Sequence, residues 1–310
     1  MTISVICPLY KAEKYIDDLD ASLRRQENVN IVEIEYIVTK VEEDKTISKL
    51  EKLNSSFDIV YPNEFSHSLT RENAARKAKG DIIVFITQDI IIQDENWLFN
   101  LTKDINEGNC EASFSKQISN SNTVEKYIRM KNYPNESRIV SKDDVKRLGI
   151  MTYFYSDASS AVRKDIYLKL NGYDGKKLLT NEDMYFSYKL INNGYRIKYC
   201  ADSKVVHSHT YSYSSLFKRY FDQGVFLKQH KYIYDSGASS SALDLLKFTI
   251  ISSIRDGNIK VLFQIVPNFA ARFLGNKFGQ IYDKLSREKI LKFTGNIGYW
   301  QSIWRNEVEK

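Results

Sequence analysis

The amino-acid sequence predicts an α/β fold in which a mostly parallel sheet is flanked by helices, followed by a helical C-terminal extension. Strand and helix patterns alternate over roughly the first 100 residues, which favours parallel strands covered on both faces. Of the 310 residues, 43% are hydrophobic and 13% aromatic, enough for one large core or a core plus an appendage. No apolar run reaches the roughly 18 residues that a transmembrane helix needs.

Short periodic patterns predict each element of the first half in turn. The strands are expected at residues 3–10, 32–40, 57–63 and 82–86. The helices between them are expected at residues 12–26, 46–54 and 68–80. The first helix has apolar residues at positions 15, 16, 19 and 23, and the last ends at Gly80.

The second half contains a further helix and strand that carry candidate functional residues. Glu182 and Asp183 begin the helical segment "MYFSYKLINNG", which Gly194 closes. Acidic residues are favoured at a helix N-terminus, so the pair could simply stabilise the helix end. The strand "RIKYCADSKVVHSHT" places His207 and His209 two positions apart, hence on the same side of an extended chain. Such a pair can bind a metal or phosphate, or be structural.

Polar residues gather where the predicted parallel strands end. In open α/β sheets, ligands bind at the carboxyl ends of the strands, so these residues should share one edge. They are Pro8, Leu9, Tyr10, Thr39, Lys40, His67, Arg71, Thr87, Gln88 and Asp89. The sequence has neither GxGxxG nor GxxxxGK[ST], so a phosphate bound here would need a metal or basic side chains. Asp89 offers the hard oxygen ligand that Mg²⁺ or Mn²⁺ prefers.

The charge and the cysteines restrict the function classes. Net charge is +6, of which residues 241–310 contribute +5 (11 Lys+Arg against 6 Asp+Glu) and residues 1–240 only +1 (34 against 33). No nucleic-acid-binding motif accompanies this basic segment, so we expect no nucleic-acid partner. Cys7, Cys110 and Cys200 form no metal or disulfide pattern, which favours a reducing, cytoplasmic location.

The chain changes character near residue 235, where "DSGASSSALD" is rich in Gly and Ser. We expect a catalytic domain at 1–235 and an extension at 236–310 with helices at 243–254 and 259–273. In the second helix Leu262, Val266, Phe269 and Phe273 share one face, and Pro267 could kink it. This amphipathic segment could anchor the protein at a membrane surface, cover the core, or form a dimer interface.

Several blocks of sequence resemble a known enzyme family. "SVICPLYKAEKYI", "SLTRENAARKAKGDIIVFITQD" and "NEDMYFSYKLINNGYRIKY" resemble family 2 glycosyltransferases of the Rossmann-like GT-A fold. "EFSHSLTRENAARKAKGDIIVFITQDI", "HSHTYSYSSLFKRYFDQG" and "ARFLGNKFGQIYDKL" are similar to bacterial rhamnosyltransferases of cell-surface polysaccharide synthesis. The blocks occur in the family's order and span nearly the whole chain.

The resemblance implies a role for most of the candidate residues. Thr87-Gln88-Asp89 occupies the place of the family's DxD motif, with Thr87 in place of the first acid, so Asp89 would hold the divalent cation. His207 or His209 would be a second ligand, with His207 slightly favoured. The usual Asp-Asp pair after the second strand is absent, so Thr39 or the acidic cluster at 42–44 would contact the base.

Further implied roles concern catalysis and the donor phosphates. Asp183, in the family's "ED" motif with Glu182, would be the catalytic base that removes the acceptor proton, and the reaction would invert the anomeric centre. Arg71 would contact the diphosphate or orient the base loop, unless it is an ordinary arginine on a helix surface. Arg219 would help to close the phosphate site. Mg²⁺ or Mn²⁺ would offset charge on the leaving group.

The expected function is an inverting, metal-dependent transfer of a sugar, with dTDP-L-rhamnose as the favoured donor. The acceptor would be a lipid-linked saccharide, which would place the protein at the cytoplasmic membrane surface, where it could form a homodimer. The first alternative is the same fold with a UDP-hexose or UDP-hexosamine donor. The second is a non-catalytic degenerate transferase or a basic binding module, for which the missing first carboxylate of the DxD motif is the main argument.

Overall fold

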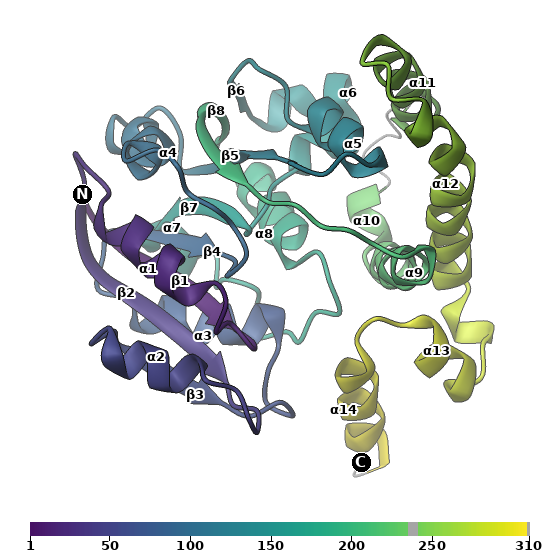
Figure 1. The fold of residues 1–310 in the computed structure, drawn as a ribbon. Coiled ribbons are helices and arrows are strands. Elements are labelled where there is room, and N and C mark those ends of the chain that lie inside the picture. The colour runs from purple at the N-terminus through teal and green to yellow at the C-terminus, as the bar shows by residue number, and fades with distance from the viewer. Residues whose placement is uncertain (235–240, 309–310) are drawn as a thin grey trace.

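The computed structural model describes residues 1–234 and 241–308, which form a mixed sheet flanked by helices (Figure 1). Within these residues the sheet has eight strands in the order β3-β2-β1-β4-β7-β5-β8-β6. In chain order the strands are β1 (Thr2–Leu9), β2 (Asn30–Thr39), β3 (Phe57–Val60), β4 (Ile82–Ile86), β5 (Ala112–Ile118), β6 (Arg138–Val140), β7 (Ser159–Arg163) and β8 (Ile197–Val206). Neighbours β3-β2-β1-β4 and the pair β5-β8 are parallel, whereas β7 and β6 run antiparallel to their neighbours. The predicted fold class is confirmed.

The helices lie on both faces of the sheet and along one end of it (Figure 1). They are α1 (Ile16–Arg24), α2 (Thr46–Lys52), α3 (His67–Lys77), α4 (Trp97–Asn106), α5 (Val124–Asn132), α6 (Val145–Leu148), α7 (Lys164–Lys169), α8 (Glu182–Asn192), α9 (Tyr213–Gln229), α10 (Lys231–Tyr234), α11 (Ser241–Arg255), α12 (Ile259–Gln280), α13 (Arg287–Phe293) and α14 (Ile297–Val308). Short 3₁₀ turns occupy Lys142–Asp144, Gly149–Tyr153 and Tyr282–Lys284. The strands and helices predicted over the first 86 residues are all present, with ends shifted by up to four residues.

The fully buried strand β4 separates two hydrophobic cores. Ile82, Val84 and Ile86 pack with α1, α2 and α4 on one face of the sheet, whereas Ile83 and Phe85 pack with α3, α7 and α8 on the other. Side chains alternate across a strand, so a continuous run of apolar residues can supply both cores at once. A buried strand of this kind fixes the residues that follow it, and Thr87-Gln88-Asp89 therefore leave the sheet at a well-defined edge.

The C-terminal helices are joined to the rest of the chain by unusually close packing of α12 on α9. A Cβ added at Gly224 of α9 would lie 2.3 Å from the carbonyl oxygen of Asn276. Cβ atoms added at Gly275 and Gly279 of α12 would lie 2.3 and 2.1 Å from carbonyl oxygens of α9. The two backbones are therefore in direct contact, and only glycine permits it.

Both helices predicted in the extension are present, and α12 continues through Pro267 to Gln280. The predicted boundary at 235/236 lies outside the described residues. The face predicted for α12 is divided: Leu262 and Phe269 pack inward, whereas Val266 and Phe273 are exposed. Among the residues with described positions, no helix has the length and apolar character needed to cross a bilayer.

Candidate functional site

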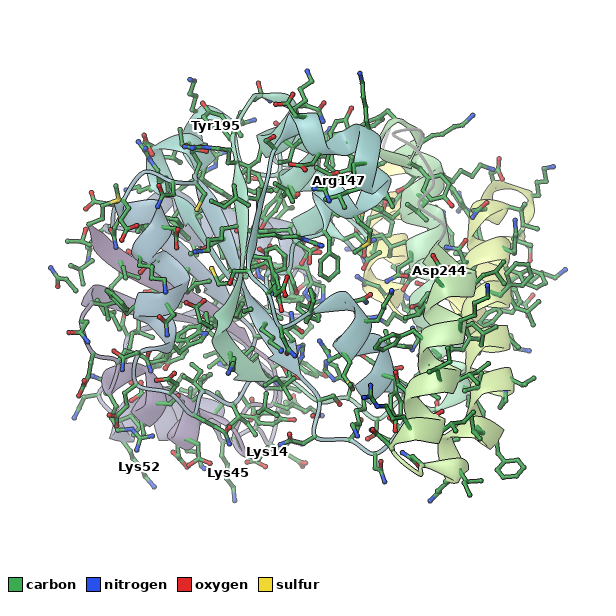
Figure 2. All side chains as sticks on the ribbon, turned by 90° about the horizontal axis from the view of Figure 1, so that it is seen from above. Lys14, Lys45, Lys52, Arg147, Tyr195 and Asp244 are labelled. Carbon is green, nitrogen blue, oxygen red and sulfur yellow. The ribbon has the colours of Figure 1, made fainter. Side chains whose placement is uncertain are left out.

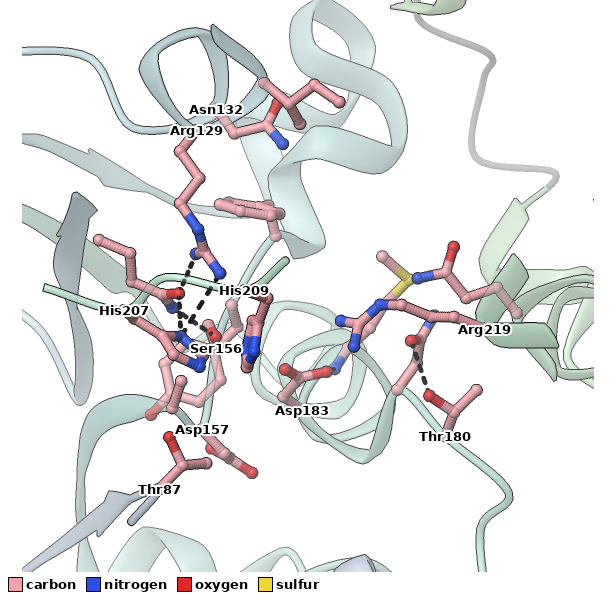
Figure 3. A pocket seen from close by; sticks show the side chains of 18 of the residues that line it. Thr87, Arg129, Asn132, Ser156, Asp157, Thr180, Asp183, His207, His209 and Arg219 are labelled. Carbon is pink, nitrogen blue, oxygen red and sulfur yellow. Dashed lines mark hydrogen bonds between the residues drawn. The ribbon is translucent and has the colours of Figure 1, made fainter. Parts of the chain in front are cut away.

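A cavity of about 510 Å³ opens at the carboxyl edge of the sheet (Figure 3). The segments after β4 and β8, the end of β5, the loop before β7 and the start of α8 meet there, and α5, α9 and α12 complete the wall. Nine predicted site residues line the cavity: His67, Arg71, Thr87, Asp89, Glu182, Asp183, His207, His209 and Arg219. Five separate segments of sequence are thus brought into one site, at the sheet edge where the rule for parallel strand ends predicts it.

Asp89, His207 and His209 form the one group of potential metal ligands found among the described residues. Their ligand atoms all lie within 4.8 Å of one another. His207 Nε2 is 3.5 Å from Asp89 Oδ1, and His209 Nδ1 is 3.7 Å from Asp89 Oδ2. Burial lowers the pKa of His209 to about 4, with the neighbouring His207 acting in the same direction, so His209 is neutral at pH 7. A carboxylate with two neutral imidazoles is a donor set that suits Mn²⁺ and that Mg²⁺ can also use.

The ring of His207 is oriented by a second layer of hydrogen bonds that the sequence reasoning missed. His207 Nδ1 lies 2.8 Å from Gln117 Oε1, and Gln117 Nε2 donates to Ser156 Oγ at 2.8 Å. Arg129 of α5 also donates to Gln117 Oε1 (Figure 3). These contacts leave Nε2 of His207 facing Asp89. Gln117 is the penultimate residue of β5, "ASFSKQI", for which the sequence patterns predicted no strand, so its position at this edge was not anticipated.

Asp183 lies at the start of α8 and faces the cavity. Its Oδ1 accepts a hydrogen bond from the backbone N–H of Met184 at 2.8 Å. The helix N-cap is Asn181, in the left-handed conformation (φ 56°), so Asp183 is not the capping residue. Burial and then the charges of Glu182 and Asp157 raise the pKa of Asp183 well above that of an ordinary aspartate. A carboxylate with a raised pKa in a cavity is the usual form of a general base.

Arg71 holds the segment that carries Asp183. Its Nη1 lies 3.2 Å from Glu182 Oε1 and donates to the backbone carbonyl of His67 at 3.1 Å. Arg71 is only 3% exposed, so the interpretation of this residue as a solvated arginine on a helix surface is wrong. Because Glu182 precedes Asp183 directly, the ion pair fixes the N-terminus of α8 against α3.

Two further arginines at the cavity, Arg129 and Arg219, form no ion pair with a carboxylate of the described residues. Arg219 of α9 donates to the hydroxyl of Tyr211 at 3.2 Å and lies over its ring. Figure 3 shows Arg129 reaching toward His207 from above and Arg219 reaching toward Asp183 from the right. Across residues 1–234 and 241–308, neither arginine forms an ion pair. Two uncompensated guanidinium groups in a cavity favour an anionic ligand such as a phosphate.

The extension also contributes to the cavity wall through Arg272 of α12. Arg272 donates to Asn268 Oδ1 at 2.7 Å, to the hydroxyl of Tyr220 and to the carboxylate of Glu125. Its charge is therefore balanced by an ion pair with Glu125. No local pattern predicts this contact, because Arg272 and Glu125 are far apart in the chain.

Six predicted residues lie at the same sheet edge but do not line the cavity: Pro8, Leu9, Tyr10, Thr39, Lys40 and Gln88. The backbone N–H of Tyr10 donates to Gln88 Oε1 at 2.6 Å, and Gln88 Nε2 donates to the carbonyl of Tyr10 at 2.9 Å. This pair ties the ends of β1 and β4 together. Leu9 and Thr39 have buried side chains, whereas Tyr10 is exposed. In the cluster at 42–44, Asp44 accepts hydrogen bonds from Thr46 at the start of α2.

Comparison with known proteins gives consistent results. Residues 4–170 match the model of glycosyl transferase family 2. The O-antigen chain rhamnosyltransferase WbaN of Salmonella anatum is 31% identical over 272 residues, covering 86% of each chain. The O-antigen chain rhamnosyltransferase RfbN of Salmonella typhimurium is 30% identical over 310 residues, covering 98% of this chain and 97% of the relative.

Solved structures share the fold at low sequence identity. The mannosyltransferase PcManGT from Pyrobaculum calidifontis, in complex with GDP-Man and Mn²⁺, matches with a TM-score of 0.60 at 13% identity, covering 91% of this chain and 88% of that one. S. aureus TarS 1-349 in complex with UDP-GlcNAc matches with a TM-score of 0.53 at 17% identity, covering 91% and 92%.

Proposed function

The chain belongs to glycosyl transferase family 2, and from this premise we propose that it transfers L-rhamnose from dTDP-L-rhamnose to a lipid-linked glycan, with inversion. It has the GT-A fold and is a glycosyltransferase with relatives in O-antigen synthesis. The observation that carries the proposal is 30% identity to an O-antigen rhamnosyltransferase over 98% of this chain. We assign catalysis to a domain at 1–235, with residues 236–310 as a helical extension that supports it.

We propose that Asp89, His207 and His209 hold Mg²⁺ or Mn²⁺. Such a cation offsets the charge that develops on a departing nucleoside diphosphate. Thr87 stands where the family has its first acidic residue, and the second imidazole compensates for that missing ligand. Both histidines therefore serve the site, rather than His207 alone.

Asp183 is the proposed base that takes the proton from the acceptor hydroxyl as that oxygen attacks the anomeric carbon. Its raised pKa makes it a stronger base than an ordinary aspartate. The ion pair of Arg71 with Glu182 keeps Asp183 in place. No covalent glycosyl intermediate is needed, so a single displacement inverts the configuration.

We assign the donor diphosphate to the region between Arg129 and Arg219, where positive charge is uncompensated. Because guanidinium groups bind phosphate oxygens in a fixed fork geometry, they would also stabilise the leaving group. The nucleoside would extend from the cavity along the sheet edge past His67 toward Gln88, Tyr10 and Thr39. In that arrangement Pro8 and Leu9 would act through their backbone, since the Leu9 side chain is buried.

A lipid-linked acceptor would bring the protein to the cytoplasmic face of the cell membrane. A homodimer is compatible with this proposal, but no single contact requires it. The non-catalytic alternative has less support because the carboxylate, the histidine pair and Asp183 share one cavity with two unpaired arginines.

The proposal is tested by incubating the purified chain with Mn²⁺, a saccharide-lipid extract, and either dTDP-L-rhamnose or UDP-glucose. Mass spectrometry should reveal a lipid-linked product that gains a deoxyhexose only with dTDP-L-rhamnose. Gain of a hexose from the UDP donor would support the first alternative instead. Transfer that proceeds equally well in excess EDTA would refute the metal assignment.

A further inference from the structure

An apolar stripe on α12 is exposed, and the one recorded contact of its rings within the described residues is that of Lys277 with Phe273. It consists of Ile259, Phe263, Val266, Phe273 and Leu274, whose side chains are 65, 79, 75, 61 and 46% exposed. Large apolar side chains at such exposure on one helix face are unusual for a surface that meets only water. Figure 2 shows the C-terminal helices at one side of the molecule with side chains directed outward.

The opposite face of α12 is firmly packed, so the stripe is not a loose segment. Val261 and Ile265 are buried in a cluster with residues of α5. Gly275 and Gly279 press against the backbone of α9. The helix orientation is therefore fixed by both neighbours, and the stripe faces away from them.

Charge around the stripe identifies the kind of partner. Lys260 and Lys277 are exposed near the two ends of α12, and the helix has no Asp or Glu. A second copy of the same stripe would offer these lysines no carboxylate and would oppose like charges in a two-fold contact. An anionic lipid surface offers both an apolar layer for the stripe and negative headgroups for the lysines.

We propose that the α12 stripe binds the surface of an anionic phospholipid bilayer, with the helix lying in the membrane plane. The helix of 22 residues is about 33 Å long, so its whole stripe can engage one surface. The proposal rests on the proposed function in one respect, because a lipid-linked acceptor is reached from such a surface. It places α9, whose Arg219 lines the cavity, directly behind the membrane-bound helix.

The test is co-sedimentation of the full chain with vesicles. One set contains phosphatidylglycerol and phosphatidylethanolamine, and the other contains only phosphatidylcholine. The double variant Phe263→Glu/Phe273→Glu changes two exposed stripe residues. The matched control Ile139→Glu/Leu168→Glu places the same charges at exposed apolar residues away from the stripe and the cavity.

The wild type and the control should sediment with anionic vesicles and much less with neutral ones. The stripe variant should bind anionic vesicles at least about tenfold more weakly, since two large apolar side chains no longer enter the lipid. Equal binding by the stripe variant, or no binding by the wild type, would overturn the proposal. A dimer that the stripe variant abolishes, detected by light scattering, would instead assign the stripe to a second copy. Nucleotide binding by every variant separates failure of this proposal from failure of the proposed transferase function.

A separate observation concerns the tautomer of His207. Gln117 is 3% exposed, and its Oε1 accepts from Arg129, a side chain that has only donors. A reversed amide would place its NH₂ group against this guanidinium, so the oxygen must face Arg129 and His207. His207 Nδ1 at 2.8 Å then has to be the protonated nitrogen. Arg129 Nη2 lies 3.5 Å from Nδ1, so its contact is much longer than the 2.8 Å contact of Gln117.

We infer that Gln117 is a positioning residue that keeps the lone pair of His207 on Nε2, directed at the proposed cation. A hydrogen bond to the distal nitrogen is how proteins commonly orient a histidine ligand. The first test is the ¹⁵N NMR spectrum of the wild-type chain without added metal, in which we expect the Nδ1–H tautomer of His207. The Nε2–H tautomer would overturn the inference.

The second test is Mn²⁺ titration followed by electron paramagnetic resonance. Gln117→Leu should bind Mn²⁺ roughly 10- to 100-fold more weakly, whereas Gln117→Glu, which keeps the acceptor, should retain most of the affinity. Equal affinity of the wild type and the folded Leu variant would refute the role of Gln117.

Discussion

Replacing Asp183 with Asn should strongly slow transfer while making the folded protein more stable. The substitution keeps the shape of the side chain and removes its charge and basicity. In the wild type, burial and the charges of Glu182 and Asp157 raise the pKa of Asp183, so its ionised form is costly to the folded state. Asparagine is uncharged and avoids this cost, but it cannot take the proton from the hydroxyl of the acceptor substrate.

The two effects have separate magnitudes. Loss of a general base lowers kcat by about 10²- to 10⁴-fold, or about 3–5 kcal/mol of activation free energy. The stability gain is about 1.4 kcal/mol for each unit by which folding raises the pKa. The folded state binds the proton of Asp183 more tightly than the unfolded state does. Proton binding by Asp183 therefore stabilises the folded wild type fully below the unfolded pKa of about 3.9. This stabilisation is lost as pH rises through the folded pKa.

The assay compares initial rates, nucleotide affinity and thermal unfolding of the two proteins from pH 4 to pH 8. For the variant we expect kcat to be lowered about 10²- to 10⁴-fold, with unchanged nucleotide affinity and a Tm advantage that grows as pH rises. The wild-type kcat/KM should rise with pH through the raised pKa, because only the ionised carboxylate accepts a proton. An unchanged kcat of the variant would remove Asp183 as the base. A variant less stable than the wild type at pH 8 would contradict the electrostatic reasoning.

Three further predictions concern the cation, the ion pair and the helix contact. Asp89→Ala should weaken Mn²⁺-dependent nucleotide binding by at least about tenfold in calorimetry, and an unaltered metal requirement would exclude Asp89 as a ligand. Arg71→Met should lower the free energy of unfolding by about 3–5 kcal/mol, because it leaves Glu182 buried and unpaired. Adding Glu182→Gln should restore much of this loss. A double variant no more stable than the single one would contradict the prediction. Gly279→Ala should cost about 1–3 kcal/mol in urea unfolding because its Cβ would lie 2.1 Å from a carbonyl oxygen, whereas Gly298→Ala, with its nearest atom at 3.9 Å, should cost little; similar losses for both would argue against the close contact.

The parts of the site that sequence reasoning predicted are those attached to regular strands and helices. Ile82–Ile86 is an uninterrupted apolar run, so the position of Asp89 at a strand end followed directly. The strand that ends at Val206 likewise placed His207 and His209 together. The role proposed for Asp183 came from the family resemblance, since its local pattern is equally that of a helix start.

The parts that were missed depend on the order of strands in the sheet. β5 pairs in parallel with β8, and this pairing, which sequence patterns do not reveal, brings Gln117 next to His207. Arg129 and Arg272 reach the cavity from helices whose packing has no local sequence pattern. The rule that ligands bind at the carboxyl ends of the strands also selected residues that share the edge without lining the cavity: Pro8, Leu9, Tyr10, Thr39, Lys40 and Gln88. Strand order alone does not limit how far a cavity extends along the edge.

The central claim is most directly tested by calorimetric titration of dTDP, UDP and GDP into the purified chain, with and without Mn²⁺. We expect dTDP to bind more tightly than the other two nucleotides and to lose most of its affinity when Mn²⁺ is absent. Stronger binding of UDP would contradict the rhamnose donor, and binding that is independent of Mn²⁺ would contradict the cation site at Asp89, His207 and His209.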